Sequence, residues 1–540
     1  MDDTIITNDP PGRELYAGYA ATPGVYDEMV TSEGTLRPHW RDFVAGLAAM
    51  DDRQRARGKA AAERMIHENG ITYDIHTDGA ARPWDLDLVP LLIPADDWRR
   101  LEAGLIQRAN LLNAILADLY GPQRLLKENH LPAPLVFASP SFLRPAHGIA
   151  APNGVYLHAY AADLGRAPDG RWWVLNDHTD APSGSGYSLE NRIVLSRCLP
   201  DLFWSCQVHT LGEYFQALHD HLLAASGRDE PRIVLLSPGP QDKSYFANAY
   251  FARYLGYTHV EGADLTMRDK HVYLKTLDGL QQVDVIVRQI PAGDCDPLEL
   301  SPFSSTGVAG LVQAVRAGNV VIANALGSGI VECEGLKGFL PSLCRSLLGE
   351  DLLLPSNATW WCGQPDARDY VVENLDKLVI GPAFGQVTQA SGAATIGAGL
   401  TAEQKNLLAE RVRTRGYQFV GQELVKLSTG PVWLGGRLQS GPMTLRVMLV
   451  PSGDSYVVMP GGLTRVSRAM DSRSLALHEG DGSKDTWVLS ERPERIVNPI
   501  STPLGTVSLR RTGKDLPSRA ADNLFWLGNC PGLIPSNTRT

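Results

Sequence analysis

A predicted β-hairpin is the feature that most constrains what this 540-residue chain can fold into. Two runs typical of β-strands, 155–166 and 171–178, flank the pair Asp169-Gly170. Asp-Gly favours a two-residue type I′ turn, because both central residues of that turn need a positive φ. If the turn has two residues, Asp163 lies opposite Asn176 across the hairpin.

The hairpin would bring polar side chains to one face. Successive side chains of a strand point to opposite faces, so Asn176 and His178 share the face of Asp163 while Asp177 points away. Oxygen and nitrogen donors grouped in this way suit a cation, so we expect Asp163, Asn176 and His178 to be metal ligands. A solvent-exposed hairpin is the alternative, and Pro168 beside the turn can shift the register by one residue.

A loop rich in serine and glycine follows the hairpin. Residues 182–186 read PSGSG, and a helical pattern begins at Tyr187 or Ser188. A helix N-terminus has free backbone N–H groups that bind anions. We therefore expect Ser183 and Gly184 to contact a phosphate beside the metal ligands.

A parallel α/β unit is predicted further along the chain. An apolar strand at 232–236, a loop, a helix at 244–255 and a strand at 257–261 follow one another. This order is typical of a Rossmann-like unit. The unit lacks G-x-G-x-x-G, which argues against a dehydrogenase. Two runs around Asp278-Gly279 predict a second hairpin, whose later strand spans 282–288.

Composition narrows the classes of function. The net charge of −10 argues against nucleic acid as the main partner. The seven cysteines form no C-x-x-C pair, which argues against a disulfide framework or zinc site and favours a cytoplasmic compartment. The apolar runs are shorter than the roughly 20 residues of a membrane span, and the N-terminus lacks the apolar region of a signal peptide. We therefore expect no membrane partner.

Stretches spread over most of the chain carry a family resemblance. They are ITYDIH (71–76), RPWDLDLVPLLIP (82–94), PSG (182–184), LENR (189–192), LLSPGP (235–240), MPGGLTRV (459–466) and GSKDTWVL (482–489). Together with the hairpin they resemble the circularly permuted ATP-grasp family related to glutathionylspermidine synthetase. The resemblance implies a mixed α+β and α/β fold. It also implies ATP-dependent ligation of a carboxylate to an amine through an acyl phosphate, with ATP and Mg²⁺ as cofactors and a small molecule or peptide as substrate.

The resemblance further implies a division of the chain. We expect a mainly helical N-terminal region (1–150), a metal-site hairpin part (151–230), a Rossmann-like pre-grasp subdomain (231–370), a nucleotide-lid part (371–510) and the start of an alpha-E domain (511–540). The run SRAADNLFWLG (518–528) resembles the first helix of that domain, and helix breakers follow it. We therefore expect the rest of that domain to be missing, and an alpha-E domain protein is a candidate partner.

Site residues outside the first hairpin follow from the same resemblance. In the family, an arginine at the position of Arg446 faces the transferred phosphoryl group, and one at Arg288 approaches the active cleft. Gln422 and Glu423 resemble the strand that takes the adenine edge. For Arg288, an ion pair with a nearby carboxylate such as Asp294 or Asp296 is the alternative.

Two further basic residues lie near glycines. Arg465 and Lys484 each follow a glycine-containing turn, which lets backbone approach an anion closely. We expect both to hold phosphates of the nucleotide. A plain turn is the alternative for each.

The chain departs from the family pattern at the expected nucleotide site. Asn176 replaces a metal-binding glutamate, and Glu334 and Gly381 replace two lysines, with Lys337 close to the first but out of register. These lysines offset the negative charge of phosphates. Two hypotheses therefore stay open: a ligase with a degenerate nucleotide and metal site, and a non-catalytic binding or scaffold protein.

Overall fold

The structure is a computed structural model, and it describes residues 13–69, 72–75, 81–242, 244–384, 394–467, 482–491 and 516–529. Within these residues helices and sheets are mixed, as the predicted fold class requires. Parts of the segment expected to begin an alpha-E domain, 511–515 and 530–540, lie outside the described residues. None of the described helices is long and apolar enough to cross a bilayer.

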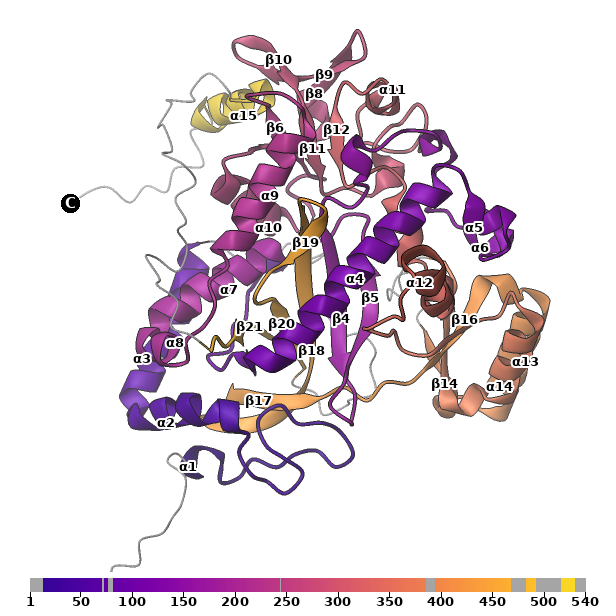
Figure 1. Cartoon of the computed structure of the whole chain (residues 1–540). Helices are drawn as coiled ribbons and strands as arrows, with labels where there is room; N and C mark the ends of the chain where they lie inside the picture. Colours follow the sequence, from indigo (N-terminus) through magenta and orange to yellow (C-terminus); the bar gives the residue numbers. More distant parts are fainter. Residues whose placement is uncertain are drawn as a thin grey trace, which may run out of the picture.

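An eight-stranded sheet forms the centre of the molecule (Figure 1). Its main path runs β3 (Leu91–Ile93), β21 (Gly482–Val488), β20 (Leu463–Val466), β18 (Arg437–Ser452), β4 (Tyr160–Arg166) and β5 (Trp172–His178). Strands β17 (Thr429–Leu434) and β19 (Ser455–Val458) pair with the long strand β18. The strands therefore come from three distant parts of the chain, and β5 lies at one end of the path.

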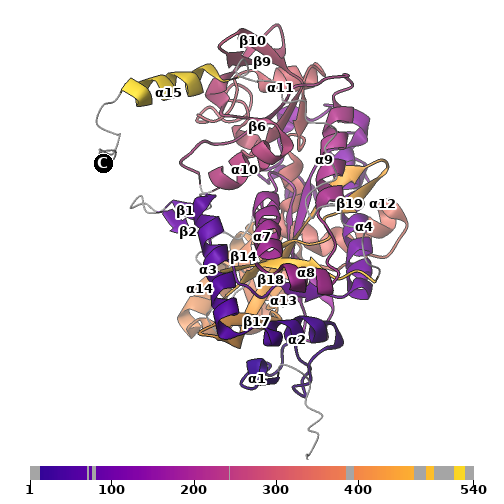
Figure 2. The same cartoon turned by 90° about the vertical axis from the view of Figure 1, so that its left-hand side faces the viewer.

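Each face of this large sheet is covered by helices (Figure 2). Helix α4 (Ala95–Leu119) lies on one face, where its leucines pack with Leu164, Leu445 and Val447. Helix α7 (Ser185–Cys198) covers the other, packing with Ala161 and Met448. Alternation along β4 and β18 explains the division, because neighbouring residues of each strand contribute to different cores. The apolar stripe at 98–120 is thus core packing.

The first hairpin has the predicted pairing at the site but a different turn. Asp163 lies opposite Asn176, yet Arg166 lies opposite Trp172, because the turn is one residue longer than expected. Gly170 takes a φ of +84°, which a residue without a Cβ adopts without strain. A bulge between Asp163 and Leu164 then restores the predicted register.

A parallel sheet carries the Rossmann-like unit. Its order is β12 (Val321–Ala323), β11 (Val285–Arg288), β6 (Ile233–Leu236) and β7 (Thr258–Val260). Helices α9 (Gly212–Ala225), α10 (Tyr245–Leu255) and α11 (Leu311–Arg316) lie beside these strands in Figure 1. The parallel unit predicted from the order of elements is therefore confirmed.

The second hairpin corrects one expectation. Strand β9 (His271–Thr276) pairs with β10 (Gly279–Val283) and with β8 (Leu265–Arg268), as a separate three-stranded sheet. The predicted strand 282–288 is broken at Asp284, whose carboxylate accepts the backbone N–H of Arg232 at 2.9 Å. The residues after this break belong to β11, in the parallel sheet.

A fourth sheet lies beside the large one. Its order is β13 (Thr359–Trp361), β16 (Phe419–Glu423), β14 (Leu378–Pro382) and β15 (Thr395–Ile396). Helices α13 (Pro365–Glu373) and α14 (Ala402–Thr414) pack on it around Val371 and Val412. We call this unit the lid. Residues 424–428 join β16 of the lid to β17, so they connect the lid to the large sheet.

Several longer helices lie outside these units. They are α2 (Arg41–Ala49), α3 (Asp52–Glu68), α12 (Leu340–Leu348) and α15 (Ser518–Asn529), with the two-stranded sheet β1 (Thr72–Ile75) and β2 (Ala81–Pro83). Helix α15 is held at its start by Arg519, which donates to both carboxylate oxygens of Asp264 at 2.9 Å. The last described helix is thereby attached to the part of the chain that carries the parallel sheet.

A buried histidine pair makes stability depend on pH. His158 Nδ1 lies 2.9 Å from His221 Nε2, and burial lowers the pKa of His158 to about 3 and that of His221 to about 4. The unfolded chain binds a proton below a pKa of about 6.5 that the folded chain excludes, so stability falls as the pH falls. At pH 5 we expect His158 alone to cost about 2 kcal/mol.

Denaturant unfolding at pH 7 and pH 5 measures this effect. His158→Phe is expected to lose less stability between the two pH values than the wild-type protein does. The exposed His147 provides the control, since His147→Phe should keep the wild-type pH dependence. An unchanged pH dependence in His158→Phe would show that the buried pair is not its source.

Candidate functional site

Three side chains form a cluster of ion pairs on the face of the large sheet that α7 covers. Arg446 donates from Nε to Oδ1 of Asp163 at 2.7 Å and from Nη2 to Oδ2 at 2.9 Å. His178 Nε2 lies 2.7 Å from the same Oδ2 and 2.9 Å from Arg446 Nη2. Both carboxylate oxygens of Asp163 are therefore engaged. We call these three residues the Asp163 cluster.

Strand pairing explains why these residues meet. Asp163 lies directly opposite Arg446 of β18, and on its other side it lies opposite Asn176 of β5. Directly opposite residues share a face of the sheet, so their side chains interact across the strands. His178 is two residues beyond Asn176 and therefore points the same way.

Electrostatics keeps Asp163 ionised. Burial alone would raise the pKa of this carboxyl, but Arg446 and His178 hold the pKa well below its usual range. The ion pair therefore contributes stability above the ordinary pKa of an aspartate, and this contribution is lost only as the pH falls through the lowered value.

The serine- and glycine-rich loop reaches the same cluster. The backbone oxygen of Ser183 accepts a hydrogen bond from Arg446 Nη1 at 3.3 Å. Gly184 has a φ of +119°, and a Cβ there would lie 2.8 Å from the Met448 side chain and 3.4 Å from that of Arg446. The helix begins at Ser185, earlier than predicted. The loop thus approaches Arg446 closely because residue 184 is a glycine.

A second charged cluster lies beside the edge strand β5. Lys337 Nζ lies 2.6 Å from Glu334 Oε2, donates to the backbone oxygen of Leu175, and lies 3.4 Å from Asn176 Oδ1. Gln422 Nε2 donates to the same Glu334 oxygen at 2.6 Å. Glu334, Lys337 and Gln422 are all buried. Strand β16 of the lid is therefore bonded directly to this cluster.

Local geometry explains the pairing of Glu334 with Lys337. Both lie on the 3₁₀ helix η7 (Glu334–Phe339). Side chains three residues apart eclipse one another on a 3₁₀ helix, whereas on an α-helix they are rotated by about 60°. Lys337 therefore lies over Glu334 on one side of this helix.

Two further predicted residues lie near these clusters. Arg465 lies opposite Thr444 and Ser483, which places it on the same face as Arg446. Glu423 ends β16 next to Gln422 and is exposed. The nucleotide contacts expected for both residues remain part of the proposed function.

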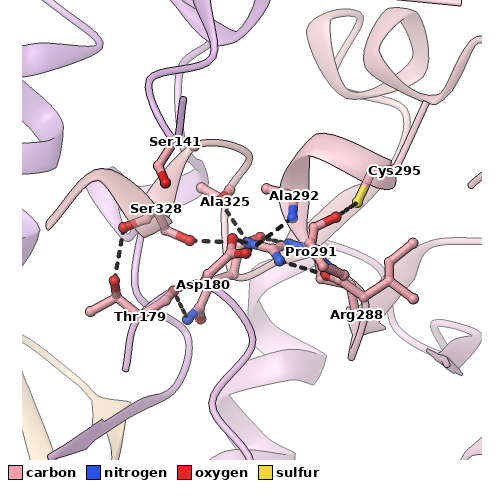
Figure 3. Close-up of polar contacts among 12 residues, drawn as sticks. Ser141, Thr179, Asp180, Arg288, Pro291, Ala292, Cys295, Ala325 and Ser328 are labelled. Carbon is pink, nitrogen blue, oxygen red and sulfur yellow. Dashed lines mark hydrogen bonds and ion pairs between the residues drawn. The ribbon is translucent and has the colours of Figure 1, made fainter. Parts of the chain in front are cut away.

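Arg288 lies in a different network, shown in Figure 3. It is 1% exposed, donates from Nη2 to Asp180 Oδ1 at 2.8 Å, and donates to Ser328 Oγ at 3.0 Å and to the backbone oxygen of Asn324 at 3.0 Å. Its ion-pair partner is therefore Asp180. The alternative named Asp294 and Asp296 as examples, and neither of them is the partner. The guanidinium joins the end of β11 to the loop after β5, the loop that also follows His178.

Lys484 also lies away from the Asp163 cluster. It pairs with Thr464 in the sheet, which places it on the face opposite Arg465. Its fully buried ammonium donates to Asp87 Oδ2 at 2.8 Å, to Val89 O at 2.9 Å and to Pro431 O at 2.7 Å. These contacts join β21 and β17 to the segment before β3. The ammonium is therefore held by protein groups, which corrects the expectation that it contacts a phosphate.

The predicted metal ligands do not fit a magnesium ion. Mg²⁺ prefers oxygen ligands in octahedral geometry. Asp163 is the one carboxylate of the predicted set, its two oxygens are held by Arg446 and His178, and the guanidinium would repel a cation. Among the described residues, no group of three or more His, Cys, Asp and Glu side chains is placed to hold a metal.

Sequence reasoning missed two acidic residues next to the Asp163 cluster. Glu332 Oε1 accepts the backbone N–H groups of Thr179 and of Asp180, the latter at 2.7 Å. Asp180 in turn pairs with Arg288. The position of Asp180 just after the hairpin was the available signal for it, whereas nothing in the sequence near Glu332 indicates that it reaches this loop.

Relatives in curated collections align with most of this chain. An uncharacterized protein of Mycobacterium tuberculosis is 37% identical over 526 residues, which cover 94% of this chain but 58% of the relative. A second uncharacterized protein of that organism is 37% identical over 500 residues, covering 91% of this chain and 89% of the relative. An uncharacterized Synechocystis protein is 33% identical over 469 residues, covering 86% and 97%. The chain thus spans only 58% of the length of the first of these relatives.

A solved structure and a family model also match this chain. A glutathione synthetase-like effector from Globodera pallida, solved in its apo form, matches with a TM-score of 0.54 at 12% identity, covering 82% of this chain and 98% of that one. This likeness shows a shared fold. The sequence model of the circularly permuted ATP-grasp type 2 family matches residues 90–467, which include the Asp163 cluster, the lid and Arg446. The chain belongs to the circularly permuted ATP-grasp type 2 family.

Proposed function

We propose that this chain binds a nucleoside triphosphate between the lid and the large sheet and acts as a carboxylate–amine ligase through an acyl phosphate. Membership of the ATP-grasp family supports a ligase kind of function, and ATP-grasp proteins generally bind ATP. The acid and amine substrates are of the small-molecule or peptide class. The cytoplasmic location and the alpha-E partner expected from the sequence remain proposals.

The observation that carries the proposal is the convergence of separate segments around Arg446. The hairpin supplies Asp163 and His178, the loop supplies the backbone of Ser183, and β18 supplies the guanidinium. A fixed guanidinium stabilises the charge that develops on a transferred phosphoryl group. In the proposed reaction Arg446 orients that group while the loop beside it excludes water.

The second charged cluster supports the position of the phosphates. Lys337 is a buried ammonium beside β5, and Gln422 joins it to the strand that resembles an adenine-binding hinge. In our proposal Lys337 meets a phosphate in place of the lysine that the sequence lacks at position 334. Glu334 neutralises that ammonium and therefore weakens the contact.

A second candidate function is a non-catalytic binding or scaffold protein. The specific observation in its favour is that each basic side chain of the two clusters is already paired: Arg446 with Asp163 and Lys337 with Glu334. A phosphate must compete with these carboxylates. Nucleotide binding distinguishes the two candidates, because a scaffold has no need of it.

Thermal unfolding in the presence of ATP, ADP or GTP tests the proposal. A nucleotide at 100 times its Kd is expected to stabilise the folded protein by about 2.7 kcal/mol. Glu334→Gln is expected to bind about tenfold more tightly, which is about 1.4 kcal/mol, because Lys337 loses its neutralising partner. Glu410→Gln, on the exposed face of the lid, is the control and should bind as the wild type does.

Each arm has an outcome that would contradict it. A folded protein that no nucleotide stabilises would favour the scaffold candidate. Equal affinities of the wild type and Glu334→Gln would show that Lys337 does not meet a phosphate, while leaving nucleotide binding itself in place.

A further inference from the structure

We infer that Asp163 in this chain is a positioning residue that fixes Arg446, and that it is not a ligand of a divalent cation. The inference deepens the proposed function, because it concerns the same cluster. It differs from the expectation drawn from the sequence, in which Asp163, Asn176 and His178 held Mg²⁺. Three observations on the described residues carry it.

The first observation is that Asp163 has no free oxygen for a metal. Its Oδ1 accepts Arg446 Nε at 2.7 Å, and its Oδ2 lies within 2.9 Å of both Arg446 Nη2 and His178 Nε2. A bidentate fork of this kind is among the stronger protein ion pairs and also fixes the orientation of the guanidinium plane. A metal could bind Asp163 only after this fork had opened.

The second observation concerns the two predicted co-ligands. Asn176 lies opposite Asp163, but in either orientation its amide faces the Lys337 and Glu334 cluster, with its oxygen 3.4 Å from Lys337 Nζ or its nitrogen 3.2 Å from Glu334 Oε1. His178 directs Nε2 at Asp163. An amide beside an ammonium and an imidazole nitrogen are poor ligands for a hard cation.

The third observation concerns Glu332, a carboxylate that binds the loop after His178. Glu332 accepts the backbone N–H groups of Thr179 and Asp180 through Oε1, which holds this side chain against the loop after β5. It therefore stabilises that loop. The positive guanidinium of Arg446 remains within the Asp163 cluster, where it would repel a cation.

These observations assign the cation of any nucleotide complex to the phosphates and exclude Asp163 as its ligand. Mg²⁺ keeps most of its waters and often binds chiefly through substrate phosphates. In this chain Asp163 would then act on the nucleotide only indirectly, through the orientation of Arg446.

Electron paramagnetic resonance of Mn²⁺ with the full chain tests the inference, because protein-bound Mn²⁺ loses the signal of the hydrated ion. The wild type without nucleotide is expected to leave that signal unchanged. With saturating ADP, Asp163→Asn is expected to change the Mn²⁺ signal as much as the wild type does. Circular dichroism melting confirms that each variant is folded.

A gain-of-function variant sharpens the test. Asn176→Glu combined with Arg446→Gln places a second carboxylate opposite Asp163 and removes the guanidinium fork that holds it. This double variant is expected to bind Mn²⁺ without nucleotide. If the folded double variant binds Mn²⁺ no better than the wild type, the missing ligands are not the cause, and the inference fails.

Wild-type binding of Mn²⁺ that Asp163→Asn removes would overturn the inference directly. The Mn²⁺ measurement without nucleotide gives its result whether or not the protein binds ATP. Failure of the proposed function would instead appear as the absence of any nucleotide-dependent change in melting. The two failures are therefore distinguishable.

Discussion

Arg108→Met is expected to lower the free energy of unfolding by about 3–5 kcal/mol, because it leaves a buried carboxylate without its partner. Arg108 is fully buried on α4 and donates to Asp177 from Nε at 2.7 Å and from Nη2 at 2.6 Å. It also donates to Ser356 Oγ at 2.8 Å. Tyr160 donates its hydroxyl to the same Asp177 at 2.6 Å. The pair joins the helix on one face of the large sheet to the edge strand β5.

Urea unfolding measures this prediction, and the chain offers a matched control. Arg345 pairs with Asp351 at 2.7 Å, but both side chains are largely exposed, so Arg345→Met should change stability by less than about 0.5 kcal/mol. Replacing both partners, in Arg108→Met with Asp177→Leu, should recover part of the loss. If Arg108→Met costs no more than Arg345→Met, the buried pair is not a main source of stability.

Arg446→Gln is expected to weaken nucleotide binding by about 100-fold or more, which is about 3 kcal/mol. The substitution removes the guanidinium proposed to face the transferred phosphoryl group. It also removes the guanidinium that offsets the charge of Asp163. The carboxylate then repels the nearby phosphates. If the wild type turns ATP over, the variant is expected to lose that turnover as well.

Loss of binding must be separated from loss of the fold. Arg437→Gln changes an exposed arginine at the start of the same strand, β18, and should bind nucleotide as the wild type does. Arg446→Gln with Asp163→Asn removes the uncompensated carboxylate, so it should melt closer to the wild type while still failing to bind. Melting curves without nucleotide provide the comparison.

The sequence predicted local features of the site well. The pairing of Asp163 with Asn176 followed from alternation and the Asp-Gly signal, although the longer turn and the bulge cancelled one another. Pro168 beside the turn indicated that the register could shift by one residue, whereas a bulge depends on contacts with strands elsewhere and could not be predicted. The parallel unit was predicted because its elements follow one another directly.

Contacts between distant segments could not be predicted in the same way. Arg446 and Asp163 are 283 residues apart, and their pairing depends on the position of β18 beside β4. The partner of Arg288 proved to be Asp180, which lies 108 residues away. Lys484 was expected near phosphate because of its glycine-containing turn, but strand register turned it to the other face. Each case depends on register or topology, which a single sequence leaves open.

Isothermal titration of a non-hydrolysable ATP analogue tests the central claim, that the cluster around Arg446 is a nucleotide site. We expect the wild type and Arg437→Gln to bind the analogue with equal affinity, and Arg446→Gln to show no measurable heat of binding. Binding of the analogue by a folded Arg446→Gln protein with wild-type affinity would contradict the claim and place the nucleotide elsewhere.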